Sequence, residues 1–206
     1  MWITSEPEKD RANFDEIHRM DDRAAAIIAC GYLDRSLEHA VRSKLRDDRR
    51  LLNKFFGGMG PLATFSAKID MGFLLDLYDE DYLSCLHSIR KIRNLFSHDP
   101  TPVDFSDSEI KKFATNLFSP GEKAKEFHDK LEKNGDSGAA IISKLAPFLV
   151  SLLRTEDAPR AKYLGSVQLC VFLLRMQTMN LRESIMFLPH PPSSKKGCLT
   201  AQPDAS

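Results

Sequence analysis

Apolar residues recur every three or four positions along most of this sequence, and that spacing limits the fold more than any other feature. Between Asp21 and Leu45 they stand at Ile27, Cys30, Leu33, Leu37, Val41 and Leu45. Because an α-helix has about 3.6 residues per turn, residues at this spacing share one face, which predicts a helix with one buried stripe. Asp21 and Asp22 are candidates for its N-cap. The sequence has no strict two-residue alternation rich in Val, Ile and Thr, so no sheet is predicted.

The same spacing, interrupted by glycine and proline, predicts an all-α fold: a single bundle of about six to eight helices. Beyond 21–45, the expected helices span about 47–56, 62–78, 79–98, 106–118, 122–133, 139–153 and 158–187. Pro61 suits the first turn of the 62–78 helix, in which Leu74 belongs to the apolar stripe, and Pro147 should kink the 139–153 helix. We expect an N-terminal segment at 1–20, one helical domain at 21–187 and a disordered tail at 188–206, because the tail has little apolar surface.

Composition narrows the function. With 29 basic and 29 acidic residues the chain is neutral, which disfavours a protein that binds DNA alone. Cys30, Cys85, Cys170 and Cys198 form no CxxC pair, and the first three lie in helical patterns, so reduced core residues are expected. The histidines lack metal-ligand spacing, and neither a metal nor a cofactor is predicted. The N-terminus does not resemble a secretory signal and no apolar run is long enough for a membrane span, which favours the cytoplasm.

The segment IRKIRNLFSHD, residues 89–99, places polar residues beside an apolar stripe. Arg90, Asn94 and His98 are four residues apart and form one helical row, and Arg93 borders it. A guanidinium, an amide and an imidazole together can bind a phosphate and move its protons. The same residues can instead hydrogen-bond the last carbonyls of the helix, with Asp99 holding the imidazole, and this structural role is the more common one.

Arg93-Asn94-Leu95-Phe96-Ser97-His98 is similar to the signature of the HEPN superfamily, an arginine followed by a polar residue and then a histidine near a helix end. This resemblance implies a homodimeric site, because in active members the arginine and histidine of two subunits face each other and cleave RNA without metal. Carried over, His98 would be the general acid or base and Arg93 would stabilise the phosphate charge. Asn94 would be the polar member of such a site.

A longer block, residues 57–99, resembles the central region of the mannitol operon repressor family. The matching features are a Gly-Pro-Leu turn, a basic residue before an aliphatic one, a small aliphatic helix end, and an Asn and His pair at the end of the next helix. Here they stand at Gly60, Pro61, Leu62, Lys68, Ile69, Gly72, Asn94 and His98. The resemblance implies a helical bundle that restrains expression of sugar-alcohol uptake genes through a protein partner, such as a DNA-binding regulator or a sugar-uptake component. No helix-turn-helix with a basic second helix stands out in the sequence.

Two charged features have competing interpretations. The stretch from Arg42 to Lys54 holds six basic and two acidic residues, which suits either RNA phosphate or, more commonly, a solvated helix face. Lys68 stands between apolar residues of a helix that must pack, and we expect it to form a structural salt bridge near Asp70 or Asp76.

Three hypotheses follow. The first is a non-enzymatic repressor of the mannitol-repressor type, and the second is a HEPN-like ribonuclease that uses Arg93 and His98 across a homodimer and binds RNA. The third is a helical interaction domain without either activity. Burial of Arg93 and His98 in intramolecular hydrogen bonds would count against the ribonuclease, because catalytic groups must reach their substrate.

Overall fold

The computed structural model describes residues 7–98, 103–133 and 158–178 of the 206-residue chain. These residues form eight helices and no strand, which confirms the all-α prediction. In chain order the helices are α1 (Pro7–Arg19), α2 (Asp22–Lys44), α3 (Arg49–Phe56), α4 (Phe65–Leu74), α5 (Glu80–His98), α6 (Ser108–Ala114), α7 (Pro120–Glu132) and α9 (Pro159–Thr178). The helix expected at 139–153, its kink at Pro147 and the tail expected at 188–206 lie outside the described residues.

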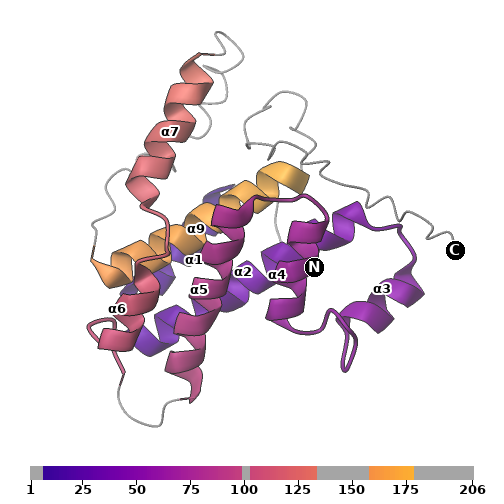
Figure 1. Cartoon of the computed structure of the whole chain (residues 1–206), viewed down its shortest axis with the longest axis horizontal. Helices are drawn as coiled ribbons and strands as arrows, with labels where there is room; N and C mark the ends of the chain where they lie inside the picture. The colour runs from indigo at the N-terminus through magenta and orange to yellow at the C-terminus, as the bar shows by residue number, and fades with distance from the viewer. Residues whose placement is uncertain (1–6, 99–102, 134–157, 179–206) are drawn as a thin grey trace, which may run out of the picture.

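Helix α2 lies at the centre of the bundle and packs against α9, α5, α4 and α1 (Figure 1). Its N-cap is Asp21, one of the two predicted candidates, whose carboxylate accepts a hydrogen bond from the Ala24 N–H at 2.9 Å. Small residues on its buried face allow close approach, and the Tyr163 hydroxyl of α9 donates to the Ala26 carbonyl at 3.0 Å. The predicted burial of Ile27 is wrong: it is 38% exposed, because alanines fill the interface in its place.

Helix α5 confirms the apolar stripe predicted for it. Its buried residues include Tyr82, Leu86, Ile89, Ile92 and Phe96. The Tyr82 hydroxyl donates to the Cys170 carbonyl of α9 at 2.9 Å, which satisfies a polar group that burial would otherwise penalise. Cys30, Cys85 and Cys170 are buried free thiols, as expected. Cys198 lies outside the described residues.

The N-terminal segment contains a helix that the sequence did not predict. The 1–20 segment contains α1, whose Phe14 and Ile17 are buried, and the Phe14 ring meets Tyr32 of α2 edge-on at 5.5 Å between centroids. Two apolar residues three positions apart in a polar segment were too short a pattern to predict this helix. Where α9 begins, the Arg160 guanidinium contacts the Asp22 carboxylate and donates to the Met20 carbonyl at 2.7 Å, which ties α9 to the α1–α2 junction.

Helices α4 and α6 are shorter than expected. Thr64 caps α4 by accepting from the Ala67 N–H at 3.2 Å, so Pro61 lies in the preceding turn and the prediction that it begins the helix is wrong. Leu74 ends α4 and is 76% exposed, against the prediction that it belongs to the buried stripe. Helix α6 is capped by Asp107 and ends at Ala114, and α7, the expected polar helix, extends away from the bundle (Figure 1).

Candidate functional site

The C-terminal end of α5 holds the three residues that the sequence singled out. Arg93 is partly buried and hydrogen-bonds the Cys30 thiol of α2, and Asn94 is also partly buried. His98 is the last residue of α5 and is exposed. Within the described ranges no hydrogen bond or ion pair engages His98. Asp99, the expected partner of the imidazole, lies outside those ranges.

Arg93 and His98 do not converge within one chain. Five helical positions separate them, and because each residue turns the helix by about 100°, their side chains leave the axis about 140° apart. Arg93 reaches inward to Cys30 and His98 faces solvent. Arg90, which shares the row of Asn94 and His98, has a buried Nε with no hydrogen-bond partner in the described part of the chain. A single chain therefore does not hold a guanidinium and an imidazole around one phosphate.

The thiol that Arg93 contacts is not a nucleophile. Burial raises the pKa of Cys30 to about 11, and the hydrogen bond from Arg93 offsets this only in part. The thiolate is the reactive form of cysteine, so a thiol that stays protonated at neutral pH is inert. Cys30 is a core residue whose sulfur accepts from a neighbouring guanidinium.

An ion-pair network around the buried Lys68 joins α2 to α4. The Lys68 ammonium lies 2.9 Å from Asp34 Oδ1 and 2.8 Å from Glu38 Oε2, and its side chain is 6% exposed. Glu38 Oε1 accepts from Arg42 Nε at 2.9 Å. We call Asp34, Glu38, Arg42 and Lys68 the α2–α4 charge ladder. The predicted salt bridge of Lys68 is confirmed, but the predicted partners are wrong, since Asp70 lies instead 3.1 Å from His87 Nε2.

The contacts within the ladder shift the pKa values of Glu38 and Lys68. Burial alone would raise the pKa of Glu38, but hydrogen bonds from Lys68 and Arg42 outweigh it and lower that pKa. Burial would likewise lower the pKa of Lys68, and its two carboxylate partners raise it instead. Glu38 and Lys68 are therefore charged at neutral pH, which fits a structural ion pair and not a lysine activated for catalysis.

The ladder ends at α3. The Arg42 guanidinium stacks over the Phe56 ring, 4.2 Å from its centroid, and Phe56 is the buried residue of α3. The turn after α3 folds back onto it, because the Leu62 N–H donates to the Phe55 carbonyl at 2.9 Å. A Cβ on Gly60 would lie 2.3 Å from the Lys54 and Phe55 carbonyl oxygens, so this close approach requires glycine. These contacts fix α3 at the periphery of the molecule (Figure 1).

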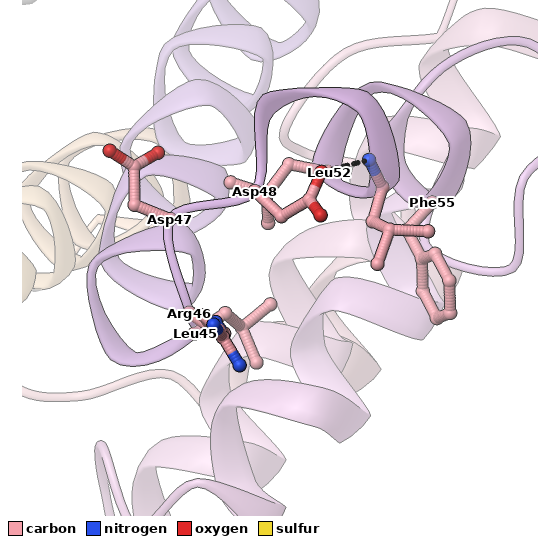
Figure 2. A pocket seen from close by; sticks show the side chains of 7 residues that line it. Leu45, Arg46, Asp47, Asp48, Leu52 and Phe55 are labelled. Carbon is pink, nitrogen blue, oxygen red and sulfur yellow. Dashed lines mark hydrogen bonds between the residues drawn. The ribbon is translucent and has the colours of Figure 1, made fainter.

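A cavity of about 400 Å³ opens beside α3 at the turn that joins it to α2. Figure 2 shows the side chains around it, with the Asp47 carboxylate pointing away from the other labelled residues. The residues that line it, which we call the α3 pocket, are Leu45, Arg46, Asp47, Asp48, Leu51, Leu52 and Phe55. Asp48 is the N-cap of α3 and accepts from the Leu51 N–H at 3.0 Å, so its carboxylate is already engaged.

The α3 pocket exposes large apolar side chains. Leu51 is 43% exposed and Phe55 42%, and Met59, in the turn that follows, is fully exposed. The sequence predicted α3 as a basic, solvated helix and missed the apolar part of its surface. The signal was present in Leu51 and Phe55, which are four positions apart in the basic stretch and therefore share one face.

Other clusters of titratable groups show little preorganisation. His128, Asp129 and Glu132 of α7 have ligand atoms within 4.8 Å of one another, but Asp129 and Glu132 are exposed. Exposed carboxylates one turn apart on a polar helix are common without any metal, because water satisfies them. His87 and Asp70 form a surface pair between α5 and α4.

Taken together, the described residues form an all-helical fold with an exposed, mostly apolar pocket beside a peripheral basic helix. Comparison with protein-family models, with curated proteins and with solved structures found no match for this chain. In the described ranges, no helix combines the length and the apolar character that crossing a membrane requires.

Proposed function

We propose that this protein is a transcriptional regulator of the mannitol-repressor type, which acts by binding another protein. The observation that supports a role in protein binding is the α3 pocket, since large apolar side chains grouped on a surface typically mark a contact site. The resemblance of residues 57–99 to the mannitol operon repressor family supports the regulatory part of the proposal. Regulation of sugar-alcohol uptake genes then depends on the partner that docks at this surface.

Direct DNA reading by α3 is less well supported. A four-residue turn, Leu45–Asp48, joins α2 to α3, and α3 exposes Arg49, Arg50 and Lys54. In a helix-turn-helix, the N-terminal residues of the second helix approach the bases. Here that end carries Asp47 and Asp48 next to Arg49 and Arg50, so it has no net positive charge with which to neutralise several phosphates. Helix α3 also exposes Leu51 and Phe55, apolar side chains that a phosphate backbone does not cover, which favours a protein partner over a DNA duplex.

The test is a complementation assay in the host. Deletion of the gene should raise expression of a reporter placed behind the promoter of the sugar-alcohol uptake genes, and the wild-type gene should restore repression. When a partner docks at the α3 pocket, the variant Phe55→Glu would have to bury a charged side chain, which is unfavourable. This variant should therefore fail to restore repression. Leu74→Glu is the matched control, because Leu74 is an exposed apolar residue at the end of α4. Equal repression by both variants would refute the proposal.

A second function, RNA cleavage by a HEPN-like site, is favoured by the exposure of His98. Because the two side chains diverge within a chain, the site would need His98 of one subunit and Arg93 and Asn94 of another. RNA incubated with the protein would then give fragments ending in 2',3'-cyclic phosphate, and His98→Ala would abolish them. Intact RNA after incubation with a folded homodimer would exclude this function.

A further inference from the structure

We infer that the α3 pocket, together with the exposed basic face of α3, binds an acidic amphipathic helix of a partner protein. This inference rests on the proposed function, since it names the chemistry of the partner through which the regulator acts. Three properties of the surface limit which partner can bind there. They are the shape of the pocket, the charge around it and the small number of aromatic residues in it.

The pocket is shaped for apolar side chains presented by a helix. Its apolar walls are Leu45, Leu51, Leu52 and Phe55, and its volume of about 400 Å³ matches cavities that take up a ligand. Asp48, Leu51, Leu52 and Phe55 recur at helical spacing, so the pocket extends along two turns of α3. A groove of this kind suits apolar residues at positions i, i+3, i+4 and i+7 of a second helix.

The charge around the pocket favours an acidic partner. Arg46, Arg49, Arg50 and Lys54 are exposed on α3 and the turn before it, and Asp47 and Asp48 are the acidic residues among them. The Asp48 carboxylate is engaged as the N-cap, and the four cations outnumber the two carboxylates. A surface with more exposed cations than anions accelerates the encounter with an acidic segment and disfavours a basic one.

Two other occupants fit less well. Single-stranded RNA is held by stacking of bases on several aromatic side chains, whereas Phe55 is the aromatic residue of the pocket and Phe56 is buried beneath Arg42. A second copy of this chain docked α3 to α3 would bring together two sets of the same exposed cations, and like charges at an interface are unfavourable.

The probe is a synthetic peptide with Leu and Phe at i, i+3, i+4 and i+7 and with Glu at its polar positions, labelled for fluorescence anisotropy. We expect the full-length protein to bind it, more weakly as sodium chloride is raised. Phe55→Glu should weaken binding by roughly tenfold or more, as loss of an apolar anchor does. Leu51→Glu is the second variant if Phe55→Glu fails to show the helical circular dichroism of the wild type.

Matched controls separate the apolar and charged contributions. Leu74→Glu should bind like the wild type, because Leu74 is an exposed apolar residue outside the pocket. Arg50→Glu should weaken binding and flatten its salt dependence, whereas Lys112→Glu, on the exposed face of α6, should do neither. Equal binding of a peptide in which Lys replaces every Glu would overturn the inference. So would binding of oligouridine in place of the acidic peptide, or a homodimer that Phe55→Glu dissociates.

The two proposals fail in different ways. If Phe55→Glu abolishes repression in the host while the acidic peptide never binds the wild type, the surface is a docking site for a partner of other chemistry, and the present inference is wrong. If the peptide binds at the α3 pocket and Phe55→Glu still represses fully, the docking chemistry stands and the proposed regulatory function is wrong.

Discussion

Replacement of Lys68 tests whether the α2–α4 charge ladder stabilises the fold. Lys68→Met keeps an unbranched apolar side chain that fills similar space, but it removes the ammonium that lies within 3 Å of both carboxylates, at 2.9 Å from Asp34 and 2.8 Å from Glu38. The two acids would then face each other beside a methyl group, with 30% and 29% of their side chains exposed. We expect a clear loss of stability, because neither carboxylate regains full hydration.

The magnitude lies between two limits. Removing one partner of a fully buried ion pair costs about 3–5 kcal/mol, and an exposed pair contributes about 0–1 kcal/mol. Since the carboxylates here are nearly a third exposed and Glu38 keeps Arg42, we expect a loss of about 2 kcal/mol in the free energy of unfolding. For a chain of this size that lowers Tm by about 4–8 °C. Lys112→Met, an exposed matched control, should change stability by about 0.5 kcal/mol or less.

The pH dependence gives an independent check. The folded pKa of Glu38 is lowered, so its contribution is present above the ordinary value of 4.5 and is lost as pH falls through the folded value. The folded pKa of Lys68 is raised, so its contribution is present below 10.5 and is lost as pH rises through the folded value. Urea unfolding from neutral to acidic pH should show the gap between wild type and Lys68→Met narrowing. Equal stability at neutral pH, or a gap that widens on acidification, would refute this reasoning.

Two further predictions concern glycine substitutions and the reactivity of Cys30. Gly60→Ala should lower Tm, because its Cβ would lie 2.3 Å from two carbonyl oxygens, whereas Gly31→Ala, with nothing within 4 Å on α2, should raise the free energy of unfolding by about 0.5–1 kcal/mol. Differential scanning calorimetry compares the two, and an equal effect of both would contradict the clash. Cys30, with its pKa raised to about 11, should resist alkylation by iodoacetamide at pH 8 and react after unfolding in urea, as mass spectrometry of the labelled peptide would show.

Local patterns predicted the helices best where apolar residues are large and regularly spaced. Helix α5 follows its sequence pattern from Tyr82 to Phe96, and α2 begins at the predicted cap, Asp21. Burial of Ile27 was predicted wrongly because the packing of α2 depends on alanines, whose contribution to a hydrophobic pattern is small. The spacing of apolar residues predicts that one face of a helix is buried. Which residues of that face are covered depends on the side chains of the neighbouring helices.

The candidate site depended on contacts that no local pattern contains. The partners of Lys68 lie 34 and 30 positions earlier in the chain, so their pairing follows from how α4 packs on α2. Residues near Lys68 in sequence, Asp70 among them, point elsewhere, because neighbours two positions apart on a helix face different directions. The α3 pocket likewise requires the turn between α2 and α3, which brings Leu45 next to Leu52 and Phe55.

The position of α3 is itself a testable consequence of these contacts. A helix of eight residues is too short to be stable alone in water, so α3 depends on Phe56, which is 6% exposed under the Arg42 guanidinium. Phe56→Ala should remove that anchor and speed amide hydrogen exchange in α3 far more than in α5, whose apolar residues pack in the core. Phe55→Ala is the matched control, since Phe55 is 42% exposed.

Amide hydrogen exchange of the two variants, measured by mass spectrometry, tests whether α3 is stabilised separately from the bundle. If Phe56→Ala loosens α3 alone, the pocket is a locally stabilised element whose geometry is set through Arg42 and the charge ladder, and peptide binding should fall with it. If Phe56→Ala weakens protection equally in every helix, α3 unfolds together with the bundle. The description of α3 as a separately anchored peripheral helix is then wrong, because its stability would come from the core as a whole.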